Sequence, residues 1–441
     1  MHRQILRIAL PAIVTNITVP LLGLVDTAIV GHMGTASYIG AVAVGSMIFN
    51  LVYWLFGFLR MGTSGLTAQA YGRRDEQAIS WQLSSSLLQA GVIAMAIVLL
   101  QRPLRQLMLL VVGPTPDVLP LTVTYYNIVV WGAPAVMGLY ALTGWFIGMQ
   151  DTRRPMVVSI VQNVVNIAAS LLLVYGFSMK IEGVAIGTVT AQYAGFGLAL
   201  ALVGRRHALM VGFREVLRRA WSEVGRMFSL NASLFFRTLC LVAVNLFFTA
   251  AGARQGAVVL AVNTLLMQLY LLFSYVMDGF AYAGEALGGR YWGADDMAQF
   301  RRLVRTLFGW GLAVAALFTM VYAVGGEPFL SLLTDESSVV RASRNYILWA
   351  CFIPFAGMAA FVWDGIFVGV TASAGMLLSS VIGAACFFTA AWLLMPQWGN
   401  HGLWVAMLLF LVVRGLVQTV LYIVKRDKPS LNGKHISSSC R

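Results

Sequence analysis

The chain has 441 residues, of which 59% are hydrophobic and only 11% are charged, and its mean hydropathy is +0.80. Because soluble domains carry about 25% charged residues, this composition excludes a soluble protein. The net charge of +13 does not indicate nucleic-acid binding, since most basic residues lie in short segments between apolar runs. We therefore predict an all-α integral membrane protein whose main partner is the lipid bilayer.

Apolar runs of the length that crosses a bilayer, roughly 20 residues, follow one another along most of the chain. No cleavable signal sequence is evident near Met1, so we expect the first run to stay in the membrane. An even number of spans places both termini on one side. The sequence predicts twelve transmembrane helices, near residues 8–31, 38–66, 80–100, 118–148, 156–176, 182–204, 224–250, 257–288, 301–325, 340–370, 376–396 and 399–424.

The distribution of basic residues indicates which side the termini occupy. Of the 30 Lys and Arg residues, 21 fall on the side of the termini and six on the other side. The remaining three, Arg60, Arg237 and Arg414, fall within or at the edges of spans. Because cytoplasmic loops carry the excess of Lys and Arg, we predict cytoplasmic termini. We expect a multi-pass monomer in the cell inner membrane.

The second half of the chain repeats the first with an offset close to 220 residues. AQAYGRRD (68–75) aligns with GRYWGADD (289–296), and GWFIG (144–148) aligns with GIFVG (365–369). Six spans followed by six in the same orientation predict two pseudo-symmetric six-helix lobes, with substrate bound between them. The predicted parts are an N-terminal lobe (1–204), a basic cytoplasmic linker (205–223), a C-terminal lobe (224–425) and a cytoplasmic tail (426–441).

Asp26 is the strongest candidate for a functional residue in the N-terminal half. It lies inside the first span, within LLGLVDTAIVG. An ionisable residue at this depth costs roughly 2.5–3.5 kcal/mol on insertion scales, which makes it a functional candidate. Apolar surroundings favour the neutral form of a carboxylate, so Asp26 is suited to exchanging a proton near neutral pH. Pro11 and Pro20 precede it and are predicted to bend this helix. The alternative is a carboxylate that hydrogen bonds hold in a purely structural role.

Polar side chains in the fifth and sixth spans are spaced three or four residues apart, so they share helical faces. Together with Asp26 they are predicted to form one polar pocket in the N-terminal half. Hydrogen bonding between helices without a transport role is the alternative. The residues are Asn163, Asn166 and Ser170 in the fifth span, and Thr188 and Gln192 in the sixth.

The C-terminal half contains three carboxylates at membrane depth. Asp278 and Glu285 are seven residues apart and therefore lie on one helical face, and Arg237 is their predicted countercharge. Asp364 lies late in the tenth span. An ion-paired brace and a part in transport both remain open for this group.

The sequence contains no pattern typical of an enzyme, a metal site or a bound cofactor. Cys240, Cys351, Cys386 and Cys440 lack metal-ligand spacing, and the five histidines form no cluster. No nucleotide-binding P-loop is present, which argues against ATP hydrolysis. A channel is less readily excluded, but paired halves favour alternating access.

Four segments of the chain resemble motifs of one transporter family. GMQDTRRP (148–155) resembles the G-x-x-D-T-R-x-P signature of multidrug and toxic compound extrusion (MATE) transporters, and NVVNI (163–167) looks like their fifth helix. NITVPLLGLVDTAIVGHMG (16–34) looks like the first helix of the DinF branch, and DGFAYAGEALGGRYWGA (278–294) is similar to its eighth. These motifs occur in the family's order, and the match covers essentially the whole chain.

This resemblance implies the MATE fold, a V-shaped pair of lobes, and export of small organic, mostly amphipathic cations in exchange for H+ or Na+. It implies a cation-coupling role for Asp26, Asn166 and Thr188. Many members have a second Asp four residues after that amide, where this sequence has Ser170. A sodium site would then lack a charged ligand. We therefore predict an H+-driven multidrug exporter that works by alternating access, with Asp26 as the protonation site.

Two alternatives remain open. The first is a Na+-coupled exporter of the same family. The second is a lipid-linked-oligosaccharide flippase of the wider superfamily, which is expected to have more cationic residues facing its central cavity. The charges at membrane depth in this sequence are mostly acidic, which argues against the flippase.

Overall fold

The computed structural model describes residues 1–31, 36–204, 213–333 and 336–426, and the secondary structure of these residues is entirely helical. The predicted tail beyond Arg426 and the first part of the predicted linker, 205–212, lie outside them. The elements are α1 (His2–Gly31), α2 (Ala36–Leu55), α3 (Phe58–Arg73), α4 (Glu76–Leu99), α5 (Gln101–Val112), α6 (Leu119–Val129), η1 (Val130–Gly132), α7 (Ala133–Gly148), α8 (Arg153–Leu171), η2 (Leu172–Gly176), α9 (Ile181–Val203), α11 (Phe213–Arg254), α12 (Ala257–Gly293), α13 (Met297–Leu333), α14 (Ser337–Ser343), α15 (Ile347–Gly369), α16 (Ser373–Trp398) and α17 (Asn400–Arg426).

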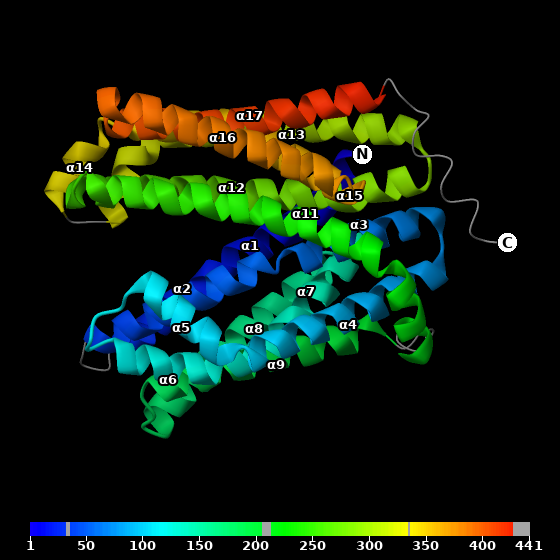
Figure 1. Cartoon of the computed structure of the whole chain (residues 1–441). Coiled ribbons are helices and arrows are strands. Elements are labelled where there is room, and N and C mark those ends of the chain that lie inside the picture. The colour runs from blue at the N-terminus through cyan, green and yellow to red at the C-terminus, as the bar shows by residue number, and fades with distance from the viewer. Residues whose placement is uncertain (32–35, 205–212, 334–335, 427–441) are drawn as a thin grey trace.

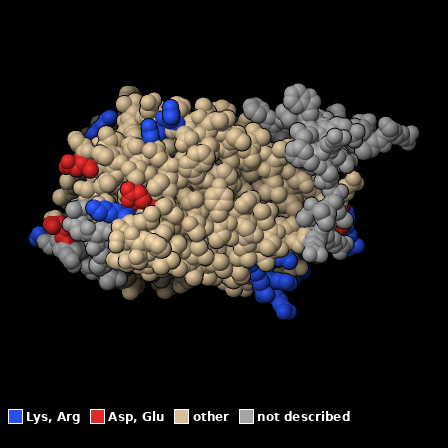
Figure 2. Space-filling view, turned by 90° about the horizontal axis from the view of Figure 1, so that it is seen from below, with Lys and Arg blue, Asp and Glu red and all other residues tan. Residues whose placement is uncertain are grey.

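The helices have the length and composition of membrane spans. Eleven segments of the described chain are long and apolar enough to cross a bilayer, and α1, with 30 residues, has the length for a twelfth. Figure 2 shows a broad surface belt without charged side chains, with Lys, Arg, Asp and Glu gathered towards the two ends. The predicted all-helical multi-pass membrane protein is confirmed.

Several boundaries differ from the predicted spans, and the predicted second span divides into α2 and α3. α11 begins at Phe213, inside the predicted linker, because no Gly or Pro interrupts residues 213–223. The predicted tenth span divides into α14 and α15. The segment after the third span, expected to be a loop, contains α5, whose Leu107 and Leu110 are exposed. A helix with an exposed apolar side is suited to lying at a membrane surface.

The helices form two bundles (Figure 1). We call α1–α9 the N-terminal lobe and α11–α17 the C-terminal lobe. The beginning of α1 and the end of α17 lie at the same end of the molecule, where the bundles meet, and the bundles diverge towards the end that carries α6 and α14. The predicted pair of six-helix lobes is thus confirmed.

α1 lies at the junction between the lobes and contacts both of them. On the C-terminal side, Asn16 donates from Nδ2 to the carbonyl oxygen of Tyr275 on α12, at 3.1 Å. On the N-terminal side, the Thr152 hydroxyl donates to the carbonyl oxygen of Ile8 at 2.8 Å. Pro11 and Pro20 both lie within α1, which is helical from His2 to Gly31. A movement of α1 would therefore be felt by both lobes.

The sequence repeat reappears in the packing where the lobes meet. Gly72 of α3 packs against the carbonyl oxygen of Arg290 on α12, and Gly293 of α12 packs against the carbonyl oxygen of Gln69 on α3. The two contacts are equivalent, because Gly293 lies 221 positions after Gly72 and Arg290 lies 221 positions after Gln69. A Cβ atom at either glycine would overlap the facing backbone, so this crossing of α3 and α12 requires glycine.

The turns that follow these two helices are equivalent as well. Arg74 and Asp295 both have left-handed backbone conformations, with φ of 57° and 56°. Asp75 and Asp296 then accept hydrogen bonds from backbone amides three residues on and so cap α4 and α13. The same offset relates all of these positions, which supports a pseudo-twofold axis between the lobes.

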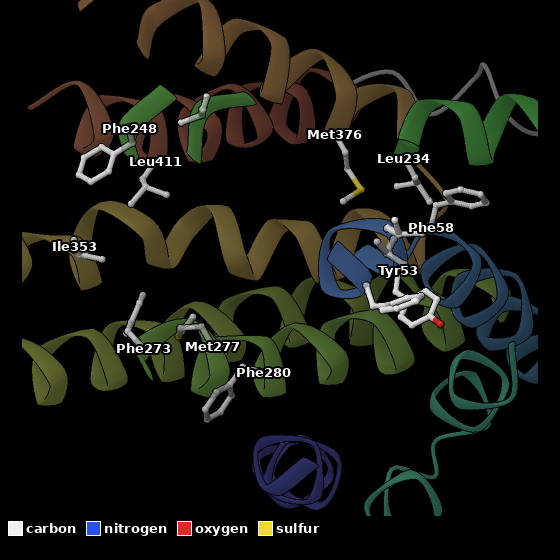
Figure 3. Packing of buried hydrophobic residues seen from close by; sticks show 14 of the residues in the cluster. Tyr53, Phe58, Leu234, Phe248, Phe273, Met277, Phe280, Ile353, Met376 and Leu411 are labelled. Atoms are coloured by element: carbon white, nitrogen blue, oxygen red, sulfur yellow. The ribbon is translucent and has the colours of Figure 1, made fainter. Parts of the chain in front are cut away.

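The core of the C-terminal lobe is built mainly from large apolar side chains. Phe273 and Met277 of α12 are fully buried, and Ile353 of α15 lies beside them (Figure 3). Phe273 also meets Phe361 edge to face, with ring centroids 5.9 Å apart. Packing of this kind holds helices together in a bilayer, where no hydrophobic effect drives them together. It holds together α12 and α15, which carry charged residues described below.

Candidate functional site

Asp26 is buried in the second half of α1, with 4% of its surface exposed. Its carboxylate lies close to the Thr188 side chain of α9. Asn166 of α8 donates from Nδ2 to the Thr188 hydroxyl oxygen at 3.3 Å. Within the described residues, Asp26 has no ion pair, and its Oδ1 atom is buried without a hydrogen-bond partner. The structure thus brings Asp26, Asn166 and Thr188 together as one chain of polar contacts.

The other predicted members of this pocket lie on the same helices without hydrogen bonding to Asp26. Asn163 donates from Nδ2 to the carbonyl oxygen of Thr18 at 2.9 Å and so ties α8 to α1. Ser170 is buried against Gly187 of α9. Gln192 packs against the backbone at Gly132.

Tyr125 of α6 belongs to the pocket but was not predicted from the sequence. Its hydroxyl group lies close to Thr188 and 3.4 Å from the hydroxyl of Ser46 on α2. A lone Tyr in an apolar span is common, so the sequence offers no signal for it. With Tyr125, helices α1, α6, α8 and α9 all contribute polar groups around Asp26.

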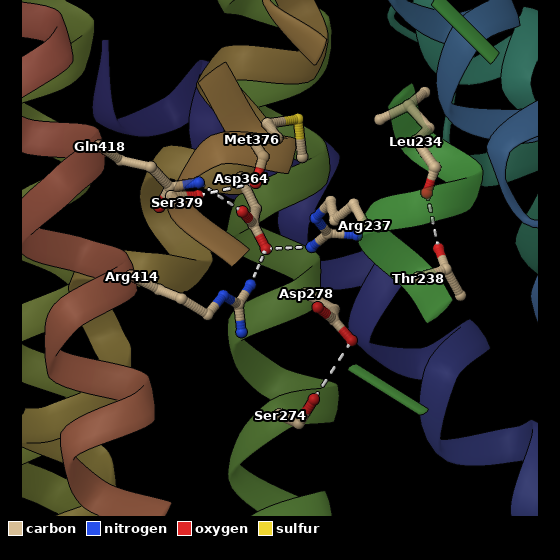
Figure 4. Close-up of polar contacts among 10 residues, drawn as sticks. All are labelled: Leu234, Arg237, Thr238, Ser274, Asp278, Asp364, Met376, Ser379, Arg414 and Gln418. Atoms are coloured by element: carbon tan, nitrogen blue, oxygen red, sulfur yellow. Dashed lines mark hydrogen bonds and ion pairs between the residues drawn. The ribbon is translucent and has the colours of Figure 1, made fainter. Parts of the chain in front are cut away.

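In the C-terminal lobe, Asp364 of α15 is the centre of a charged cluster (Figure 4). Its Oδ2 atom accepts hydrogen bonds from Arg237 of α11 and, at 2.7 Å, from Arg414 of α17. Its Oδ1 atom accepts from Nε2 of Gln418 at 2.7 Å. The predicted pairing of Arg237 with Asp278 and Glu285 is therefore wrong. The fold directs Arg237 of α11 to the carboxylate on α15.

The two carboxylates of α12 have different partners. Glu285 pairs with Arg60 of α3 across the lobe junction, at 3.3 Å. The Arg60 guanidinium also stacks over the ring of Tyr282, 4.5 Å from its centroid. Asp278 accepts only a 3.4 Å hydrogen bond from Ser274 and has no ion pair within the described residues. Arg60 and Arg414 were visible in the sequence as arginines at spans, but their partners were not.

A cavity of about 640 Å³ lies between the lobes, and all of these charged side chains line it. Helices α2, α3 and α7 line it on one side and α11, α12, α15 and α17 on the other. The prediction that membrane-depth charges are mostly acidic does not hold here, because arginines and carboxylates are equal in number. The charged lining residues are Arg60, Arg237, Arg414, Asp278, Glu285 and Asp364.

The D-T-R-x-P run begins α8 at the end of the molecule where the lobes meet. Asp151 accepts hydrogen bonds at Oδ1 from the backbone amides of Arg153 and Arg154, at 3.1 and 3.3 Å. Its other carboxylate oxygen lies 3.2 Å from the Arg154 side chain. The neighbouring Gln150 donates from Nε2 to the carbonyl oxygen of Ala286 on α12, at 2.7 Å. This motif therefore starts a helix and joins the lobes.

Among the described residues, no group of three His, Cys, Asp or Glu side chains is placed to hold a metal ion.

Comparison with known proteins places this architecture among characterised sequences and folds. The MatE family profile matches residues 11–172 and 233–393, one segment in each lobe. The chain is 38% identical over 410 residues to DNA damage-inducible protein F of Escherichia coli (strain K12), covering 93% of this chain and 89% of that protein. It is 29% identical to Protein DETOXIFICATION 44, chloroplastic, of Arabidopsis thaliana, covering 93% of this chain and 80% of that protein.

Solved structures share the fold at low sequence identity. A MATE crystal structure in the bent conformation superposes with a TM-score of 0.86 at 16% identity, covering 97% of this chain and 95% of that one. The Vibrio cholerae MATE transporter VcmN in its bent form superposes with a TM-score of 0.83 at 19% identity, covering 96% of each chain. These similarities concern the fold.

Proposed function

Because the chain belongs to the MATE family of multidrug efflux transporters, as its motifs predicted, we propose that it is a secondary active exporter that exchanges organic cations for protons. The observation that carries this proposal is the setting of Asp26, a buried carboxylate without an ion pair in the described residues. Such a group in a span is suited to gaining and losing a proton during transport.

The contacts of Asp26 suggest how its protonation reaches other helices. A hydroxyl has a single hydrogen to donate. When Asp26 is neutral, the Thr188 hydroxyl donates to the carbonyl oxygen of Val184, a contact of 3.0 Å. When Asp26 is ionised, the same hydroxyl turns to the carboxylate. Because Thr188 also accepts from Asn166 and lies close to Tyr125, one proton affects groups on four helices.

We propose that α1 transmits this change to the C-terminal lobe through its contact with α12. The functional units are then the lobes 1–204 and 224–425, joined by a basic cytoplasmic linker. With both termini in the cytoplasm of a bacterial inner-membrane protein, the end at which the lobes diverge faces outwards. Entry of a proton from outside neutralises Asp26 and displaces the organic cation, and proton release to the cytoplasm restores the binding form.

The test is uptake of a fluorescent organic cation by vesicles that contain the purified protein. An imposed pH gradient is expected to drive transport in the wild type and to fail in Asp26→Asn, which cannot exchange the proton. Asp117→Asn, which removes an exposed loop carboxylate, is the matched control and should transport normally. Full pH-driven transport by Asp26→Asn would contradict the proposal.

The same vesicles distinguish the Na+-coupled alternative. The side chain four residues after Asn166 is the hydroxyl of Ser170, so the pocket offers Na+ one carboxylate only. We therefore expect an imposed sodium gradient at equal pH to drive no transport. If a sodium gradient drives uptake and Asp26→Asn abolishes it, Asp26 is the coupling residue and the coupling ion is Na+.

A further inference from the structure

The charges in the cavity between the lobes are not paired evenly. Arg60 and Glu285 neutralise each other in a one-to-one pair. Arg237 and Arg414, by contrast, share the single carboxylate of Asp364. These three residues therefore carry a surplus positive charge.

The two arginines also retain unused hydrogen-bond donors. A guanidinium has five N–H donors, and each of these arginines donates to Asp364 through one nitrogen only. The Nε atoms of Arg237 and Arg414 are buried without a partner in the described structure. Both side chains are more than nine-tenths buried, with 7% and 5% of the residue surface exposed, and both line the cavity. Burying cationic donors without an acceptor is costly.

Asp364 accepts from neither of the two Nε atoms. Its Oδ2 atom receives both arginines, and its Oδ1 atom receives Gln418. The surplus must therefore be balanced either at a distance by Asp278 or by a ligand.

Asp278 presents the opposite charge to the same cavity. It lies on α12, where Ser274 is its hydrogen-bond partner, and it forms no ion pair with a described residue. Asp278 comes from α12, whereas Arg237 and Arg414 come from α11 and α17, and in Figure 4 the dashed line from Asp278 runs to Ser274. The aromatic rings of Tyr270 and Phe361 line the same cavity. A carboxylate beside aromatic faces is suited to an organic cation.

We propose that this cavity binds zwitterionic organic molecules, with their carboxylate on Arg237 and Arg414 and their cationic group beside Asp278. The inference rests on the proposed exporter function and specifies its substrate class. A carboxylate matches the guanidinium fork better than any neutral group. The cavity volume lies within the range of sites for drug-sized ligands. A purely cationic molecule would satisfy Asp278 and leave the arginine surplus unbalanced.

Two dyes that differ only at the carboxylate test this assignment. Rhodamine 110 carries a free carboxylate beside its cationic ring system, and rhodamine 123 is its methyl ester. Binding to the full-length protein in lipid nanodiscs is measured by fluorescence anisotropy without any ion gradient. We expect rhodamine 110 to bind the wild type about tenfold more tightly, as a charge-assisted contact provides.

The variants separate the two ends of the site. Arg414→Gln is expected to bring the affinity ratio of the two dyes close to one, and Asp278→Asn is expected to weaken both dyes. Arg237→Lys keeps the charge but loses the fork, so it should reduce the preference for rhodamine 110 in part. Arg105→Gln removes an arginine outside the cavity that bonds Asn127 and should leave the ratio unchanged.

Equal affinity of the wild type for both dyes would overturn the proposal. The proposal would also be overturned if Arg414→Gln elutes as a single species on gel filtration and shows the same affinity ratio of the two dyes as the wild type. If Arg414→Gln does not fold, the other two variants test the proposal. Wild-type affinity of Asp278→Asn for both dyes, together with a wild-type affinity ratio in Arg237→Lys, would contradict the proposal. Because binding needs no gradient and leaves Asp26 intact, failure here is distinct from failure of proton coupling in vesicles.

Discussion

Asp26 in the N-terminal lobe and Asp364 in the C-terminal lobe are both buried carboxylates in spans, but their surroundings differ. Asp26 lies close to the hydroxyl of Thr188 and keeps one oxygen without a partner in the described structure. Asp364 receives two arginines and a glutamine, which occupy both of its oxygens. The setting of Asp26 fits the proton exchange that we propose for it, whereas Asp364 is bound by two cationic neighbours.

The repeat shows that this difference arose on one shared backbone plan. The offset of 221 residues that relates the packed glycines places Phe387 opposite Asn166 and Ala391 opposite Ser170. The α16 helix of the C-terminal lobe thus has apolar side chains where α8 has polar ones. The close helix crossings use glycine in both lobes, but the polar residues of α8 have no counterpart in the C-terminal lobe. The fold is therefore duplicated, whereas the polar pocket is not.

The largest expected effect tests the claim that Asp364 is a fixed anion. Asp364→Asn leaves Arg237 and Arg414 buried with no counterion. Removing one partner of a buried ion pair costs about 3–5 kcal/mol, so we expect a large fall in the unfolding temperature of the purified protein. Asp26→Asn, which breaks no ion pair, should unfold close to the wild-type temperature. Equal destabilisation by both variants would remove the contrast.

A smaller loss is expected at the pair that joins the lobes. Glu285→Gln keeps the shape but removes the charge that faces Arg60, while the ring of Tyr282 still covers the guanidinium. Hydrogen bonds to charged groups contribute about 1.5–3 kcal/mol. Thermal unfolding followed by tryptophan fluorescence checks this, with Asp117→Asn as the exposed control. A wild-type unfolding temperature would show that the pair contributes nothing to stability.

The lobes should respond alike where the backbone plan is shared. Gly72→Ala and Gly293→Ala each place a Cβ atom against a facing carbonyl oxygen, at Arg290 and Gln69 respectively. Overpacking of this kind costs about 1–3 kcal/mol, and the two variants should be destabilised to a similar extent. Gly91→Ala is the control, since no atom lies within 4 Å of the added methyl group. A large difference between the two variants would argue against equivalent crossings.

The smallest expected change in stability sharpens the description of the Asp26 pocket. Thr188→Val keeps the volume and removes the hydroxyl that connects Asp26, Asn166 and Tyr125. We expect a loss of about 0.5–1.5 kcal/mol, the net contribution of a hydrogen bond, together with slower pH-driven transport in vesicles. Thr190→Val, on an exposed side of α9, is the matched control. Normal transport by Thr188→Val would exclude the hydroxyl from coupling.

Much of the N-terminal pocket could be predicted from the sequence, and less of the C-terminal cluster. Asn166 and Thr188 were identified because polar residues spaced three or four apart share a helical face, and because a buried carboxylate such as Asp26 requires polar side chains nearby. Tyr125 was missed because nothing local distinguishes a functional tyrosine from a packing one. Arg237 was assigned the wrong partners because three carboxylates in the same half were equally plausible in sequence.

Composition and periodicity by themselves determined that this chain is a helical membrane protein with two repeated halves. A bilayer demands long apolar helices whatever their order, and the repeat is a property of the letters. Only the tertiary structure decided which charges meet. Ion pairs such as Arg237 with Asp364 join helices more than a hundred residues apart, and the packing of those helices selects one partner among several of equal chemistry.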